Sequence, residues 1–147
     1  MLSSLQAYSQ FIYLLPDRYP SVRGSTLIVI PLGATMGSLR GVIEFDGAIA
    51  LRVVEELDFN AQRIEYYSYT VSRGEETLYW YDPQPHPNDP SLASTHPHHK
   101  HVPPDTTSLD AKRSGIKHNR IPAPGISFEQ PNLSFLIEEI EYNLLSS

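Results

Sequence analysis

The sequence predicts a single α+β domain spanning all 147 residues, in which helices cover one face of an antiparallel sheet. Three observations support this prediction. Hydrophobic residues recur with a helical period near both ends of the chain. Between residues 25 and 81 they instead alternate with polar residues, as in strands, and the spacers there are short. Short connections favour a meander of antiparallel strands over parallel strands joined by helices.

The two end segments have the spacing of amphipathic helices. Residues 1–15 place their hydrophobic side chains on one helical face, and Pro16 is expected to end this helix. Residues 132–145 begin at Asn132, a residue type that often caps helices, and continue with a hydrophobic stripe opposite several glutamates. We expect both helices to pack on the sheet.

About five strands are expected in the central part of the chain. Ser25–Leu32 is rich in β-branched residues and is predicted to be a largely buried strand. Asp46-Gly47 predicts a two-residue hairpin turn, because both central positions of that turn take positive φ. The other strands are expected at residues 39–45, 49–57, 63–71 and 76–81.

A long segment without regular pattern, residues 82–126, follows the predicted sheet and contains all six histidines. Loops of this length in compact domains are usually functional or disordered. Four histidines surround Lys100, at positions 96, 98, 99 and 101. Residues 96–120 carry a balance of +3, whereas the whole chain has a net charge of −6. This basic strip fits contact with a phosphate backbone or an acidic partner.

The histidine cluster has three interpretations, and its spacing does not decide between them. In the first, two imidazoles act as general acid and base while Lys100 stabilises a phosphate, the chemistry of metal-independent RNA cleavage. Imidazole suits this role because its unperturbed pKa is about 6.5. In the second, the histidines bind a divalent metal ion. In the third, the segment is an exposed loop without chemistry.

The metal interpretation makes a geometric prediction. In an extended segment, His99 and His101 lie on one side and His98 faces away. Asp82 or Asp89 is then available as a carboxylate ligand.

Tyrosines form a second feature, because two neighbouring strands each carry a pair on one face. Tyr67 and Tyr69 form one such pair, and Tyr79 and Tyr81 form the other. An exposed pair is suited to stacking RNA bases. The alternative is that tyrosine is simply a favoured strand residue.

Three arginines lie on neighbouring predicted strands. Arg40 and Arg52 alternate with inward-facing residues, so both are expected on the open face of the sheet, where an arginine can bind a phosphate through two hydrogen bonds. The alternative for these arginines and Arg63 is a surface ion pair with Glu44, Glu56 or Glu65.

Several classes of protein do not fit the sequence. It contains no cysteine, which excludes disulfides and thiolate metal sites. No hydrophobic stretch approaches the roughly 20 residues of a membrane-spanning helix, and the first residues do not resemble a signal peptide. Gly-rich phosphate loops and nucleophile elbows are also missing. We expect a soluble cytoplasmic protein that uses no cofactor.

One set of motifs resembles a known family. Tyr81-Asp82, Pro85-His86-Pro87 and the string THPHHKH at Thr95–His101 are similar to the hallmark of TumE-like toxins of bacterial toxin–antitoxin systems. The resemblance extends from about Gly37 to His101, and the residues 105–127 depart from it as an insertion-like stretch.

The resemblance implies a type II toxin, neutralised by an antitoxin that carries a helix-turn-helix DNA-binding domain. Analogy with other small helix-plus-sheet toxins suggests RNA as the target, and a homodimer is possible. The expected catalytic residues are His98, His99, Lys100 and His101. The expected substrate-binding residues are Arg52, Tyr67, Tyr69, Tyr81, His86 and His96, with no metal ligand among them. The alternative is a non-enzymatic module that binds a partner or a metal and whose histidines organise a loop.

Overall fold

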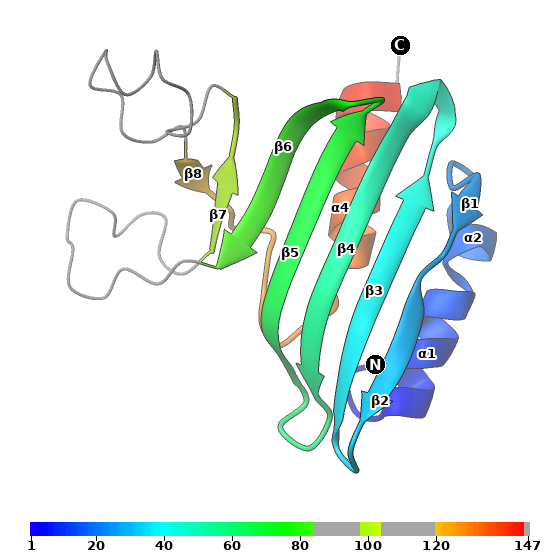
Figure 1. Ribbon diagram of the computed structural model, residues 1–147, viewed down its shortest axis with the longest axis vertical. Helices are drawn as coiled ribbons and strands as arrows, with labels where there is room; N and C mark the ends of the chain where they lie inside the picture. The colour runs from blue at the N-terminus through cyan, green and yellow to red at the C-terminus, as the bar shows by residue number, and fades with distance from the viewer. Residues whose placement is uncertain (84–97, 104–119, 146–147) are drawn as a thin grey trace.

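The computed structural model describes residues 1–83, 98–103 and 120–145. Within them, an antiparallel sheet in the order β1-β3-β4-β5-β6-β7-β8, with β2 also paired to β3, forms the body of the molecule (Figure 1). The strands are β1 Gly24–Ser25, β2 Ile28–Leu32, β3 Met36–Glu44, β4 Ile49–Asp58, β5 Arg63–Arg73, β6 Glu76–Pro83, β7 His98–His101 and β8 Arg120–Pro122. The α+β class and the meander order are confirmed.

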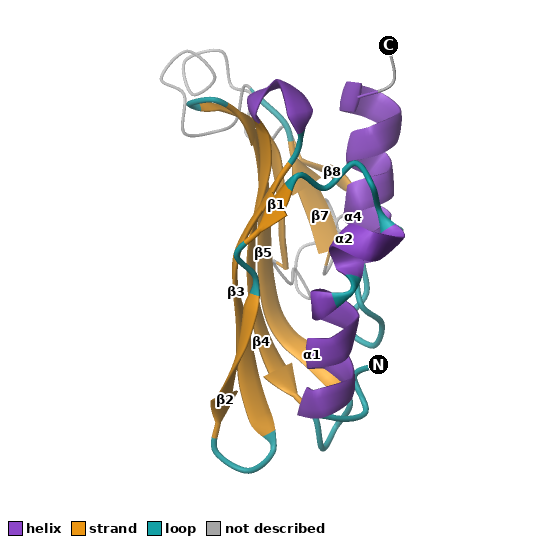
Figure 2. Ribbon diagram, turned by 90° about the vertical axis from the view of Figure 1, so that its right-hand side faces the viewer, coloured by secondary structure: helices purple, strands orange, loops and turns teal. Residues whose placement is uncertain are grey.

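In the described part of the chain, α1, α2 and α4 lie on one face of the sheet and leave the other face, called the open face, without a helix (Figure 2). The helices span Leu5–Tyr13 (α1), Leu15–Arg18 (α2) and Leu133–Ile140 (α4), and α4 continues as a single π-helical turn, η3 Glu141–Leu145. Ser4 caps α1 by accepting a hydrogen bond from the backbone N–H of Ala7 at 3.0 Å. The expectation that Pro16 ends the first helix is wrong in detail. Pro16 lies in the first turn of α2, where a residue without an N–H loses no helical hydrogen bond.

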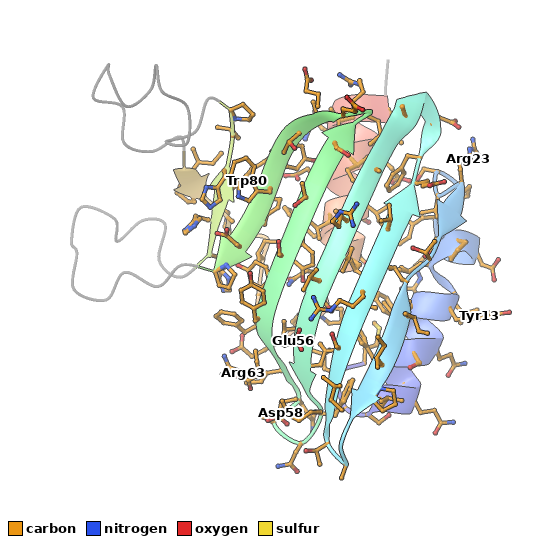
Figure 3. All side chains as sticks on the ribbon, viewed as in Figure 1. Tyr13, Arg23, Glu56, Asp58, Arg63 and Trp80 are labelled. Carbon is orange, nitrogen blue, oxygen red and sulfur yellow. The ribbon has the colours of Figure 1, made fainter. Side chains whose placement is uncertain are left out.

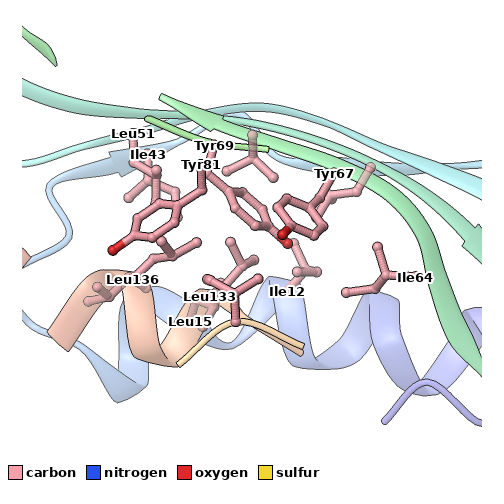
Figure 4. Packing of buried hydrophobic residues seen from close by; sticks show 14 of the residues in the cluster. Ile12, Leu15, Ile43, Leu51, Ile64, Tyr67, Tyr69, Tyr81, Leu133 and Leu136 are labelled. Carbon is pink, nitrogen blue, oxygen red and sulfur yellow. The ribbon is translucent and has the colours of Figure 1, made fainter. Parts of the chain in front are cut away.

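The core lies between the sheet and the helices (Figure 4). Tyr67, Tyr69 and Tyr81 point from the strands toward α4, where Leu133 and Leu136 are fully buried. Of the two interpretations of Tyr67 and Tyr69, the exposed stacking pair is wrong, since both are 0% exposed, and their role as ordinary strand residues fits the structure. The alternation along this strand was predicted correctly, but the face on which the two tyrosines lie is the one that the helices cover.

Strand β2 is an edge strand, contrary to the prediction of a largely buried strand over Ser25–Leu32. It pairs with β3 alone, and Ile28, Ile30 and Leu32 are 58%, 40% and 51% exposed. These side chains lie on the open face, since Ile28 is paired with Arg40. Pro31, which cannot donate to a ladder, is typical of such an edge.

The β3–β4 connection is a three-residue turn, η1 Asp46–Ala48, in place of the predicted two-residue turn. The prediction of positive φ holds for Gly47, at 73°, but the second such residue is Ala48, at 62°. Elsewhere in β3, Gly41 has a φ of 145° and packs against the backbone of Thr26 and Leu27.

Two strands occur inside the segment that was predicted as a loop, residues 82–126. β7 pairs with β6 and β8 pairs with β7, so the sheet has eight strands among the described residues instead of about five. The histidine-rich segment lacks the hydrophobic alternation that marks a strand. It is a strand because it pairs with β6, and its composition does not predict that pairing.

Candidate functional site

Strand β7 divides His98–His101 between the two faces of the sheet. Asp82 is paired with His99, and Trp80 with His101, so these four side chains lie on the open face. Lys100 is paired with Tyr81, which belongs to the core. The predicted alternation, with His99 and His101 together, is therefore confirmed.

Asp82, His99 and His101 converge on one atom. His101 Nε2 forms a hydrogen bond with Asp82 Oδ1 at 2.8 Å, and His99 Nε2 lies 2.9 Å from the same oxygen. The two imidazole rings meet edge to face, with centroids 4.6 Å apart. His99 is 0% exposed and His101 is 2% exposed, whereas the Asp82 side chain keeps 21% of its surface. The expectation of an exposed histidine loop is wrong for these residues.

The carboxyl group of Asp82 stays ionised despite its partial burial. Burial acts to raise its pKa, but the hydrogen bond to His101 and the charges of His101 and His99 act to lower it. The net effect is a pKa below the ordinary value. A carboxylate held against two imidazoles fixes their orientation and stabilises the positive charge that a ring gains on taking up a proton.

A row of side chains crosses the open face from β4 to this cluster. Thr70 of β5 is paired with Arg52 on one side and with Trp80 on the other. Trp80 stacks on His101, with ring centroids 4.7 Å apart and planes 4° from parallel. Figure 3 shows Trp80 beside β7 and Glu56 farther along the same face. Arg52 is exposed on this face, as predicted.

His98 lies on the helix-covered face. Its Nδ1 is 2.6 Å from the hydroxyl of Tyr67, and its ring packs at 4.5 Å against that of Phe128. Burial, followed by the charge of Asp82, raises the pKa of Tyr67. The Tyr67 hydroxyl therefore keeps its proton at neutral pH, and the tautomer of His98 sets which of the two groups donates the hydrogen bond between them.

Lys100 also lies on the helix-covered face, where it connects β7 to α4. Its Nζ is 3.3 Å from Glu139 Oε2 and 4.1 Å from the ring centroid of Tyr79. The hydroxyl of Tyr81 donates to both oxygens of Glu139, at 2.9 and 2.8 Å. The four residues that were predicted as one catalytic cluster therefore do not form one, because His98 and Lys100 face away from His99 and His101.

A buried carboxylate links the core tyrosines. Glu55 is 0% exposed and accepts hydrogen bonds of 2.5 Å from both Tyr8 and Tyr69. Asn132 donates to the Tyr69 hydroxyl at 2.9 Å, so it contacts the sheet and does not cap α4 through its side chain. Burial raises the pKa of Glu55, and although both tyrosine hydrogen bonds act to lower it, the resulting pKa is about 7.

The predicted substrate-binding residues have different outcomes. Tyr67, Tyr69 and Tyr81 are at most 2% exposed, so their rings are not available for stacking a base. Arg40 and Arg63 form the surface ion pairs named as the alternative, with Glu56 and Glu65. His86, His96 and Asp89 lie outside the described residues.

Sequence reasoning did not place Trp80 beside the histidines, and it considered Asp82 as a metal ligand and as part of the family motif. The signal was present in the string Tyr79–Asp82, because alternation that buries Tyr79 and Tyr81 necessarily turns Trp80 and Asp82 to the open face.

The cluster has the composition of a metal site. One ligand atom from each of Asp82, His99 and His101 lies within 4.8 Å of the others. Two imidazoles and a carboxylate suit a divalent transition metal such as zinc. Zinc would bond each ligand atom at about 2.0–2.2 Å. In a tetrahedral site the ligand atoms themselves would then lie slightly farther apart than the 2.8 and 2.9 Å that now separate the two histidine nitrogens from the Asp82 oxygen.

Comparison with protein families matches residues 14–141 to the family described as Toxin TumE. The chain belongs to the TumE toxin family. Membership marks it as a toxin of a toxin–antitoxin system and implies a cognate antitoxin as partner. The match extends well beyond the motifs that first suggested TumE, from Leu14, just before α2, to Glu141, the first residue of η3. Searches of curated proteins and of solved structures found nothing similar to this TumE-family chain.

Across the described part of this TumE-family chain, every helix is too short or too polar to cross a membrane.

Proposed function

We propose that this TumE-family toxin is an endoribonuclease that cleaves RNA without a metal ion, with Asp82 and His101 as its proton-transfer unit. The observation that supports this proposal is the convergence of two imidazoles on one carboxylate oxygen, at 2.8 and 2.9 Å. Groups capable of proton transfer are often gathered in this way at functional sites.

The reaction requires one base and one acid. The base removes the proton from the 2′-hydroxyl, whose oxygen attacks the neighbouring phosphorus. The bond from phosphorus to the 5′-oxygen breaks, and the acid gives a proton to that oxygen. The products are a 2′,3′-cyclic phosphate and a 5′-hydroxyl. Proton transfer of this kind contributes about 10²–10⁴-fold to the rate.

The geometry suggests a distinct role for each residue. His101 serves in turn as base and acid: it takes the proton from the 2′-hydroxyl and delivers it to the leaving 5′-oxygen, and the Asp82 carboxylate stabilises its charged form in between. His99, which is fully buried, is a positioning residue that holds Asp82 through its contact of 2.9 Å with the carboxylate. Lys100 has no place in this mechanism, because Glu139 neutralises it on the other face.

Access to His101 requires movement when RNA binds. The side chain is 3% exposed in the free protein, and Asp82 is the most accessible member of the cluster. Catalytic contacts in free enzymes often reach their working geometry only in the complex.

The deciding experiment is 5′-end mapping of cellular RNA after induction of the protein in a bacterial host. New discrete ends with the intact protein, lost in His101→Gln and in Asp82→Asn, would support the proposal. Asp17→Asn, on α2, is the matched control and should behave like the intact protein. Discrete ends that persist in both site variants would overturn the histidine chemistry, and growth arrest without new ends would move the target away from RNA.

A second candidate function is metal binding, favoured by the same three convergent ligand atoms. In that case the cluster organises the surrounding chain around an ion, and the toxin acts by binding alone. Metal analysis of untagged protein tests this candidate, since a histidine-rich chain collects metal from a nickel column. One ion per chain, lost in Asp82→Asn, would favour it over acid–base chemistry.

The antitoxin is proposed to be a helix-turn-helix protein that represses the shared operon, and an RNA target places the toxin's action in the cytoplasm. Co-expression with the product of the neighbouring gene should yield a stable complex that restores growth. Sedimentation of the toxin alone tests whether it forms a homodimer.

A further inference from the structure

Trp80 is the only tryptophan of the chain and presents a partly exposed ring on the open face. One side of this ring is covered by His101, which stacks on it from β7 at 4.7 Å. The other side therefore faces away from β7, toward Thr70 on β5. Partly exposed aromatic rings on a sheet face are the surfaces on which unpaired bases stack.

Thr70 and Arg52 follow Trp80 across the sheet, and we call the space above Thr70, between Trp80 and Arg52, the slot. Thr70 lies between Trp80 and Arg52 in the same cross-strand row, and its short side chain forms the floor. Strands are about 4.8 Å apart, so the Cα atoms of Trp80 and Arg52 are about 10 Å apart. A flat base that stacks on Trp80 fits into that width and leaves room for the guanidinium on its far side.

Arg52 is the arginine on this face that is available for a ligand. Arg40, its neighbour on β3, forms an ion pair with Glu56. In the described part of the chain, no carboxylate lies within ion-pair distance of Arg52. An unpaired guanidinium at the edge of an aromatic slot suits a phosphate, which it can bind through two hydrogen bonds.

We propose that this slot binds single-stranded RNA, with one base between Trp80 and Arg52 and the adjoining phosphate on Arg52. The inference rests on the proposed function and specifies the form of its substrate. A base in a duplex is paired and stacked on both faces, so only an unpaired base can enter the slot. Because the opposite side of Trp80 stacks on His101, a strand held in the slot runs close to the Asp82–His101 unit.

Binding is best measured with 2′-O-methyl RNA, which has no nucleophilic 2′-hydroxyl and so stays intact. The fluorescence of Trp80 reports the slot directly because the chain has no other tryptophan. A short single strand should quench it, and the same strand annealed to its complement should not. Anisotropy of a labelled strand gives an affinity that does not depend on tryptophan and so serves for the variants.

Matched variants separate the slot from general effects on folding. Trp80→Leu should weaken binding of the single strand by about tenfold or more, the size of one base–aromatic stack, and Trp80→Phe should restore most of it. Thr70→Phe should block the slot, whereas Thr70→Val, which keeps its shape, should not. Arg52→Gln should make the dependence of log affinity on log salt shallower by about 0.7, the value for one phosphate contact, and Arg40→Gln should leave it unchanged.

Two results would overturn the inference: equal affinity for single strand and duplex, or full affinity in both Trp80→Leu and Thr70→Phe. Cleavage that depends on Asp82 but not on Trp80 would keep the ribonuclease and overturn the slot. Binding that depends on the slot, without any cleavage of natural RNA, would keep the slot and overturn the ribonuclease.

Discussion

Tyr69 donates a hydrogen bond of 2.5 Å to Glu55, and neither side chain has any exposed surface. Through Tyr8 and Asn132 the same carboxylate joins α1, the sheet and the start of α4. A buried acid in this position makes the stability of the fold depend on pH.

Glu55→Gln should remove that dependence. Burial raises the pKa of Glu55 to about 7, against about 4.5 when it is exposed to water. The stabilising contribution of this group is therefore complete below pH 4.5 and is lost as pH rises through 7, by an amount on the order of 3 kcal/mol. Urea unfolding at a series of pH values should show this loss in the natural protein and a flatter profile in the variant. An unchanged profile in Glu55→Gln would assign the dependence to another group.

Tyr69→Phe should destabilise the fold by about 1–3 kcal/mol. The change leaves one oxygen of Glu55 and the side-chain amide of Asn132 without the hydroxyl that they share. Tyr66→Phe, on the same strand but 45% exposed, is the control and should stay within about 0.5 kcal/mol of the natural protein. Equal effects of the two changes in thermal unfolding would show that the hydroxyl network contributes little.

Lys100 and Glu139 should show energetic coupling in a double-mutant cycle. They lie 3.3 Å apart with side chains 17% and 15% exposed, so solvent screens the pair less than it screens a surface pair. We expect Lys100→Met and Glu139→Gln to be non-additive by about 1 kcal/mol in chemical unfolding. Additive effects would mean that packing of the Lys100 stem on Tyr79, and not the ion pair, fastens β7 to α4.

Gly41→Ala should be much more damaging than Gly47→Ala. Both glycines have positive φ, so both changes strain the backbone. A Cβ at position 41 would also lie 2.7 Å from the backbone oxygen of Thr26, whereas one at position 47 meets nothing within 4 Å. The difference in unfolding free energy between the two variants measures the cost of this close approach. Equal losses would show that the segment around Thr26 moves aside freely.

Much of the sheet could be predicted from the sequence, because its inner strands alternate clearly. β4 and β5 begin at the predicted residues, Ile49 and Arg63, and the open-face position of Arg52 follows from the same period. The edge position of β2 could not be predicted in this way. A β-branched strand looks the same in sequence whether its neighbour is another strand or solvent.

The candidate site was predicted in part. Alternation correctly placed His99 beside His101, with Asp82 as a possible third member. Alternation does not reveal which face of the sheet the helices cover. Because they cover the face that carries Tyr67, this residue is buried and Trp80 lies on the opposite face. The pairing of β7 with β6 is a tertiary contact, and short-range patterns in a histidine-rich segment carry no signal for it.

The position of Lys100 has a consequence for how the toxin is made. Its partner Glu139 lies 39 residues further along the chain, so β7 is synthesised before the helix that fastens it. A nascent chain thus contains His99, His101 and Asp82 without the anchor that joins their strand to the core. β7 is therefore fastened to the core only after α4 has been made and has docked.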